Sequence, residues 1–143
     1  MDPADLSRVA RPVVLGRADY AKGNRMDHPN IHGVMPIHRY ALGRALASLT
    51  RRAAGLAGLR DSQSGFTAIS RSALGRIDLD ALYPRYGYPN DLIGRLALAG
   101  CTIEDVVIRP VYRGEKSGLR PWHLATIGAI VARVYLRRVG VIT

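Results

Sequence analysis

A polar loop runs directly into an apolar segment in the stretch Asp61-Ser62-Gln63-Ser64-Gly65-Phe66-Thr67-Ala68-Ile69-Ser70-Arg71. Acid, amide and hydroxyl groups precede Gly65, and the residues that follow predict a strand over 65–70. Such a loop can point polar groups into a pocket, because the strand behind it fixes their position. A plain turn, in which Asp and Ser satisfy backbone groups, is the simpler alternative for the loop taken alone.

Helical and strand-like segments alternate on both sides of this stretch, and this alternation predicts an α/β fold. Helices are expected over 2–13, 37–56, 72–82, 90–99 and 121–138. Further strands are expected over 19–22 and 102–111, the second as an inner strand. Asp2 is expected to cap the first helix and Asn90 the fourth, while Gly23-Asn24 suggests a turn. Residues 24–36 are expected to form an irregular, mobile loop.

The composition is typical of one folded domain, and its charge predicts anionic partners. The 143 residues are 48% hydrophobic and carry a net charge of +10. All basic residues except Lys22 and Lys116 are arginines, which favour planar recognition of phosphate and carboxylate. Phosphorylated small molecules, anionic lipid and nucleic acid all fit this charge. Nucleic acid fits least, because aromatic residues are only 6% and no recognition motif occurs.

The cysteine and histidine residues do not indicate a disulfide or a metal site. Cys101 is the only cysteine, which excludes an internal disulfide and a thiolate metal cluster, and it is expected to pack as a small hydrophobe. The histidines of the 28–38 segment are too irregularly spaced for a zinc site. No metal ligands are therefore assigned in this chain. The charge-free run over 121–132 is too short to span a bilayer.

Two further segments carry residues suited to chemistry. Lys22-Gly23-Asn24-Arg25 puts two cations around a glycine, which suits a pyrophosphate, although a solvated basic turn is the alternative. Asp91 falls in the first turn of an expected helix, where it either stabilises the helix dipole or acts as a general base.

Three segments together resemble the family 2 glycosyltransferases, in particular the dolichol-phosphate-mannose-synthase-like branch that acts on polyprenyl phosphates. They are Tyr20-Ala21-Lys22-Gly23-Asn24-Arg25, the Asp61 stretch quoted above, and Tyr86-Gly87-Tyr88-Pro89-Asn90-Asp91. The resemblance implies that residues 1–120 are the C-terminal part of a GT-A-type (nucleotide-diphospho-sugar transferase) catalytic domain. Residues 121–143 would follow as an amphipathic helix, for which the resemblance implies a membrane surface, while an ordinary helix packed on the core is the alternative.

The resemblance also implies a function and a site. The function is inverting transfer of a sugar from a nucleotide-sugar donor to a polyprenyl phosphate or other lipid-linked acceptor, in the cytoplasm at the inner membrane face. Asp61 and Asp91 are the candidate catalytic carboxylates, with Asp91 as base or scaffold. The candidate substrate-binding residues, for the sugar and for the phosphates, are Lys22, Arg25, Gln63, Ser64, Arg113, Lys116 and Ser117.

The resemblance covers only the later part of the family's catalytic domain. In the family, a nucleotide-binding half with an Asp-x-Asp motif comes earlier and holds Mg²⁺ or Mn²⁺, so this chain alone is expected to be inactive. Asp78-Leu79-Asp80 has the right spacing but is expected on a surface helix. Without sheet neighbours, the strands are expected to associate through an exposed edge. The alternative is a non-enzymatic basic module that binds anionic membrane or nucleic acid.

Overall fold

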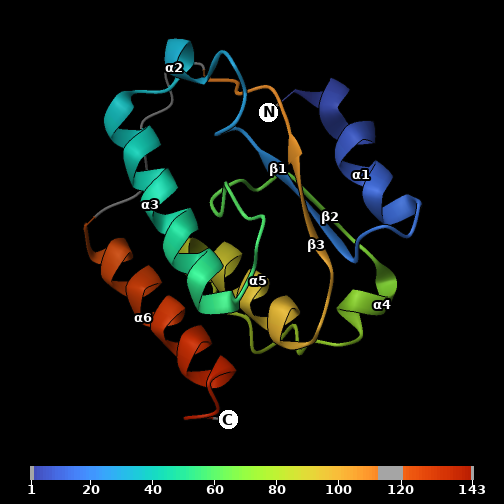
Figure 1. Cartoon of the computed structure of the whole chain (residues 1–143), viewed down its shortest axis with the longest axis vertical. Helices are drawn as coiled ribbons and strands as arrows, with labels where there is room; N and C mark the ends of the chain where they lie inside the picture. Colours follow the sequence, from blue (N-terminus) through green and yellow to red (C-terminus); the bar gives the residue numbers. More distant parts are fainter. Residues whose placement is uncertain (1, 113–120, 143) are drawn as a thin grey trace.

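The computed structural model describes residues 2–112 and 121–142. At its centre lies a mixed sheet of three strands in the order β2-β1-β3 (Figure 1). The middle strand, β1 (Tyr20–Asn24), pairs antiparallel with β2 (Thr67–Ile69) and parallel with β3 (Ile103–Val107). All five residues of β1 are buried, because both its edges and both its faces are covered. The chain therefore has a mixed α/β fold, as the sequence predicts.

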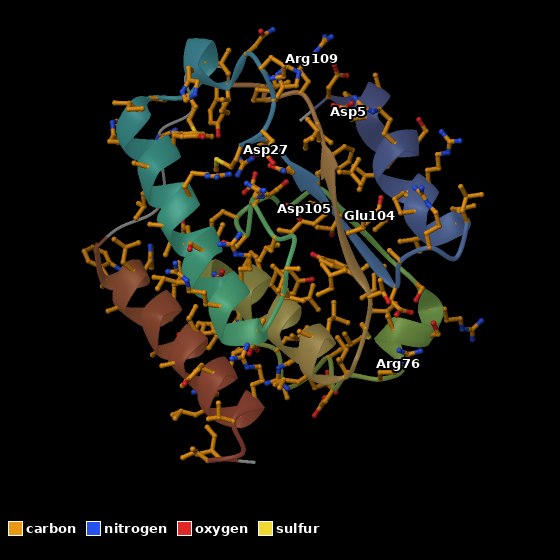
Figure 2. The ribbon with its side chains drawn as sticks, viewed as in Figure 1. Asp5, Asp27, Arg76, Glu104, Asp105 and Arg109 are labelled. Carbon is orange, nitrogen blue, oxygen red and sulfur yellow. The ribbon has the colours of Figure 1, made fainter. Side chains whose placement is uncertain are left out.

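One face of the sheet is covered by the N-terminal helix. A short 3-10 turn, η1 (Pro3–Asp5), leads into α1 (Leu6–Val14), and the Asp2 side chain accepts a hydrogen bond from Ala4 N at 3.0 Å, which confirms the expected cap. Val9 of α1 packs on Ala21 and Ile108. The Asp5 carboxylate also accepts a hydrogen bond from Arg109 N at 2.8 Å, which ties the segment after β3 to α1 (Figure 2).

Three longer helices lie on the other face of the sheet: α3 (Ile37–Ala54), α5 (Tyr88–Leu98) and α6 (Pro121–Arg138). Leu92, Ile93 and Leu96 of α5 pack against Tyr20 of the central strand. The apolar stripe of α6 is buried against α3 and α5, with Ile127 0% and Ile130 2% exposed. The expected helix over 121–138 is confirmed, and α6 packs on the rest of the domain.

Glycine residues allow the close contact between α5 and α6 and the end of α3. Gly94 of α5 faces α6 so tightly that a Cβ at this position would lie 2.3 Å from Val134 Cγ2. Gly55 ends α3 with φ of 72°, a conformation that glycine adopts without strain. Short helical turns complete the chain: α2 (Ile31–Val34), α4 (Arg71–Leu74) and η2 (Arg85–Gly87).

Several expectations about local structure are wrong, each because tertiary packing overrides local sequence signals. Gly23 and Asn24 belong to β1 rather than to a turn. β3 is an edge strand of the described sheet, not an inner one. The 24–36 segment contains α2 and is anchored by the buried side chains of Met26, Ile31 and Met35.

The cap of α5 also differs from the expectation. Gly87 is its N-cap residue, and Asn90 lies inside the first turn with a 0% exposed side chain that bonds to neighbouring elements. None of the helices in the described ranges has both the length and the apolar character needed to cross a membrane.

Candidate functional site

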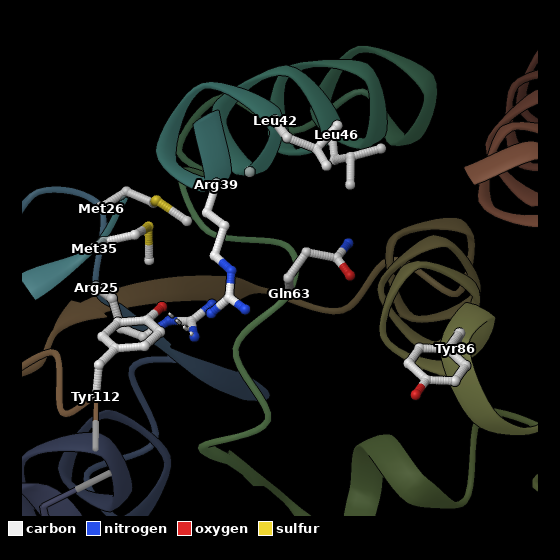
Figure 3. A pocket seen from close by; sticks show the side chains of 10 residues that line it. Arg25, Met26, Met35, Arg39, Leu42, Leu46, Gln63, Tyr86 and Tyr112 are labelled. Carbon is white, nitrogen blue, oxygen red and sulfur yellow. Dashed lines mark hydrogen bonds between the residues drawn. The ribbon is translucent and has the colours of Figure 1, made fainter. Parts of the chain in front are cut away.

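A cavity of about 310 Å³ opens between α3, the end of β1 and the Asp61 loop (Figure 3). We call it the α3 cavity, and it is lined by Arg25, Met26, Met35, Arg39, Leu42, Gly43, Leu46, Gln63, Tyr86 and Tyr112. A second hollow of about 350 Å³ adjoins it, shares Gln63 and Tyr86, and adds Arg85 and Pro89. The volume of the α3 cavity lies within the range of roughly 300–1,000 Å³ that is typical of small-molecule sites.

Arg25 and Asp61 form the central contact of the site. The fully buried Asp61 carboxylate accepts hydrogen bonds from Arg25 N at 3.2 Å, Nε at 2.8 Å and Nη2 at 3.1 Å. Burial lowers the pKa of Arg25, but its hydrogen bonds to Asp61 and the charge of Asp61 outweigh burial and raise the pKa. Asp61 therefore acts through Arg25, whose Nη1 donates to the Tyr112 hydroxyl at 3.3 Å in the cavity wall (Figure 3).

Lys22 lies in the interior rather than in the cavity. Its side chain is 0% exposed, and its Nζ donates to the Ser64 carbonyl oxygen. Burial lowers the pKa of Lys22 to about 8, although the charges of Asp61 and Asp105 oppose that shift. Lys22 therefore fixes the Asp61 loop to the sheet through this hydrogen bond. Its buried position does not support direct contact with a phosphate.

Asp105 adds a half-buried carboxyl group that sequence reasoning missed. It stands opposite Lys22 in the parallel pairing of β1 with β3, and its Oδ2 accepts from Arg60 N at 2.6 Å (Figure 2). Burial raises the pKa of Asp105 to about 6, against the lowering effect of the Arg60 hydrogen bond. The signal in the sequence was a pair of carboxylates, Glu104 and Asp105, within a strand whose other residues are apolar.

Gln63 lines the α3 cavity, and hydrogen bonds to neighbouring residues fix its side-chain amide. Its Nε2 donates to Asn90 Oδ1 at 3.1 Å and to Ser62 Oγ at 3.1 Å. Asn90 Oδ1 also accepts from Thr50 Oγ1 at 2.9 Å, so the amide of Gln63 is connected to α3 and α5 together. Ser64, by contrast, is 1% exposed and does not line the cavity.

Asp91 is buried away from the cavity, at 2% exposure. Its carboxylate accepts from Tyr83 N at 2.9 Å and from Arg95 Nε at 3.0 Å, one turn along α5. These contacts favour the scaffold alternative over the general base.

Arg39 and Tyr112 line the cavity although the sequence analysis did not select them. The signal for Arg39 was its position one helical turn before Leu42, on the inward side of α3.

Arg113, Lys116 and Ser117 lie outside the described residues. Across residues 2–112 and 121–142, no group of three or more His, Cys, Asp or Glu side chains is arranged to hold a metal ion. Asp78 Oδ1 accepts hydrogen bonds from the backbone N–H groups of Asp80 and Ala81, as a turn residue does. Cys101 is buried in the core cluster around Tyr20, where it packs as a small hydrophobe.

No protein-family model, curated protein or solved structure matches this chain. What the site offers is defined by its own geometry: a fixed guanidinium, a second arginine and an amide, facing apolar side chains of α3 and of the 26–35 segment.

Proposed function

We propose that this chain forms the acceptor-binding part of a family 2-like, GT-A-type glycosyltransferase that transfers a sugar from a nucleotide-sugar to a polyprenyl phosphate. The observation that carries the proposal is the mixed lining of the α3 cavity. Arg39 supplies a cation, and Arg25, whose charge Asp61 balances, supplies guanidinium N–H donors. Apolar side chains line the same cavity: Met26, Met35, Leu42 and Leu46. An anionic headgroup joined to an apolar chain matches both parts of this lining.

In the proposed reaction, an oxygen of the acceptor phosphate attacks the anomeric carbon of the sugar. The new carbon–oxygen bond forms as the bond from that carbon to the nucleotide diphosphate breaks, and the diphosphate leaves with the electron pair. A phosphate nucleophile is already anionic, so no general base is required. Asp91 can then remain a structural residue, as its bonds to Tyr83 and Arg95 favour.

Arg25 and Arg39 orient the phosphate, and Gln63 supplies an amide beside them. In the resembling family, Mg²⁺ or Mn²⁺ neutralises the leaving diphosphate. The described residues do not fit this metal, because no acidic group lines the α3 cavity. The metal and the base and ribose of the donor would be held by the nucleotide-binding half that precedes this region in the family.

Binding of farnesyl phosphate tests the proposal on the chain itself, with farnesol as the ligand that lacks the anion. We expect ligand-observed NMR to detect farnesyl phosphate binding and much weaker farnesol binding. Arg39→Gln should weaken the first by roughly tenfold, the usual loss for one charge-assisted hydrogen bond. Arg71→Gln removes the same charge from an exposed residue far from the cavity and serves as the control. Equal binding of the two ligands would contradict a phosphate site.

We also propose that the protein works peripherally at the cytoplasmic side of a membrane. Trp122 is 58% exposed and Tyr135 is 48% exposed on α6, and both residue types favour the headgroup level. Co-sedimentation with phosphatidylcholine–phosphatidylglycerol vesicles should fall when Trp122 is replaced by Ser. Unchanged sedimentation of that variant would remove α6 from the membrane contact.

A further inference from the structure

Another, smaller hollow lies between α3 and the segment that contains Leu59 and Arg60. It measures about 80 Å³ and is lined by Arg44, Ala47, Ser48, Arg51, Leu59 and Arg60. It shares no lining residue with the α3 cavity. The helical repeat of 3.6 residues explains the separation, because residues 39, 42, 43 and 46 face the cavity and residues 44, 47, 48 and 51 face the hollow.

The hollow has an apolar floor and cationic walls. Ala47 and Leu59 are each 2% exposed, so they form a buried base. Arg44 and Arg51 lie two turns apart on α3, and Arg60 comes from the loop that continues into Asp61. Ser48 adds a hydroxyl that can donate a hydrogen bond to an anion.

The positive charge of this hollow is only partly balanced. Arg44 donates to Asp27 Oδ1 at 3.1 Å, and the Asp105 carboxylate reaches the backbone of Arg60 rather than its guanidinium. Within the described part of the chain, the guanidinium groups of Arg51 and Arg60 have no carboxylate partner. The helix dipole favours a cation in the last turn of α3, which accounts for Arg51 alone. It does not account for three arginines that converge on one hollow.

Size and chemistry together restrict what the hollow can hold. A volume of about 80 Å³ is well below the roughly 300–1,000 Å³ of small-molecule pockets, so a nucleotide or a sugar ring does not fit inside. A tetrahedral phosphate group is small, carries the complementary charge and offers several acceptor oxygens to guanidinium forks and to a hydroxyl.

We infer that the hollow bordered by Arg44, Ser48, Arg51 and Arg60 is a binding site for a single phosphate group. The phosphate belongs either to a soluble phosphorylated molecule or to a lipid headgroup, because both present the same oxygens. The inference does not rest on the proposed glycosyltransferase activity. It concerns a face of α3 that the proposed acceptor does not touch.

The test uses the full chain in an Arg39→Gln background, because the α3 cavity also contains arginines. Titration with inorganic phosphate, followed by calorimetry at low salt, measures the soluble source. Co-sedimentation with phosphatidylcholine vesicles containing phosphatidic acid measures the lipid source, against vesicles in which oleic acid supplies the same surface charge without phosphate. We expect binding in at least one arm, with phosphatidic acid preferred to oleic acid if the source is lipid.

Arg51→Gln/Arg60→Gln should lower the affinity in that arm by roughly tenfold or more, because two charge-assisted hydrogen bonds are lost. The matched control, Arg11→Gln/Arg71→Gln, removes two exposed charges from α1 and α4 and should change the affinity much less. Ser48→Asp is a second variant, in which the added carboxylate should repel the phosphate while the arginines remain.

Three results would overturn the inference: no binding in either arm, equal losses in the two double variants, or no preference for phosphatidic acid over oleic acid when only vesicles bind. Thermal melting of each variant checks that it is folded. If Arg51→Gln/Arg60→Gln fails this check, Ser48→Asp alone decides the outcome.

Discussion

Asp61 and Asp91 are two buried carboxylates, 0% and 2% exposed, and each accepts a hydrogen bond from the Nε of an arginine. The donor is Arg25 at 2.8 Å for Asp61 and Arg95 at 3.0 Å for Asp91. The difference lies in what else the arginine touches. Arg95 stands one turn from Asp91 in α5, and its Nη2 donates to the Ala81 carbonyl oxygen at 2.6 Å. Arg25 comes from a distant segment, and its Nη1 meets Tyr112 in the wall of the α3 cavity.

The same type of ion pair therefore has two roles. The Arg95–Asp91 pair stabilises α5 locally, whereas the Arg25–Asp61 pair positions the Arg25 guanidinium at the wall of the α3 cavity. The sequence made both carboxylates candidates for catalysis, with a scaffold role as the alternative for Asp91, whereas the second contact of each arginine separates them. Charge density separates them as well, because Lys22 and Asp105 lie near Asp61.

Asp61→Ala should cost the most stability. It leaves Arg25 without its carboxylate partner and removes the acceptor for Gln63 N. Breaking a buried pair by removing one partner typically costs about 3–5 kcal/mol in the free energy of unfolding. Urea denaturation followed by circular dichroism measures the change. A loss below that of Asp91→Ala would reverse the ranking of the two regions.

Asp91→Ala should cost less, about 1.5–3 kcal/mol, the usual contribution of a hydrogen bond to a charged group. The loss is smaller because Arg95 is bonded to Ala81 as well and belongs to the same helix as its partner. Binding of farnesyl phosphate should be unchanged in this variant. Weakened binding in a protein that melts cooperatively would show that Asp91 contributes to the site after all.

Gly94→Ala tests how tightly α5, the helix that carries Asp91, packs against α6. The new Cβ would lie 2.3 Å from Val134 Cγ2, so α6 must move. Overpacking typically costs about 1–3 kcal/mol, and the better helix propensity of Ala returns about 1 kcal/mol, which leaves a net loss of about 1 kcal/mol. Gly128→Ala is the control within α6, since no atom lies within 4 Å of its added Cβ. Equal melting temperatures for the two variants would contradict the tight packing.

The smallest effect concerns pH and the charges near Asp61. The pKa of Asp105 is raised from its ordinary 3.8 to about 6, chiefly by burial. Between these values the folded state binds more protons than the unfolded state, so the free energy of unfolding falls as pH rises. The stability contributed by the protonated carboxyl is complete below the lower value and lost above the higher one.

Asp105→Asn should remove this slope. Urea denaturation of both proteins between pH 4 and pH 6 measures it, in a window where Lys22, whose pKa is about 8, stays protonated. Parallel stability curves for the two proteins would show that Asp105 titrates normally.

Local signals predicted most of the helices. Asp2 and Pro3 marked the first turn, Gly55 marked the end of α3, and the apolar stripe of α6 gave its bounds of Pro121–Arg138. The same signals failed at Gly23 and Asn24, whose turn propensity is overridden by pairing with β3 on one side of β1. They also failed at Asn90, which was expected to cap α5. Its side-chain oxygen instead accepts hydrogen bonds from Thr50 and Gln63.

The sequence by itself determined the α/β class, the arginine-rich charge, the helices with strong end signals, and the segment around Asp61 as a place for polar chemistry. These features depend on residues close together in the chain. The tertiary structure decided that Asp61 holds Arg25, that Lys22 is buried, that Asp91 braces α5, and that Arg39 and Tyr112 reach the cavity. These contacts join distant segments, and only the packed sheet and helices bring their side chains within bonding distance.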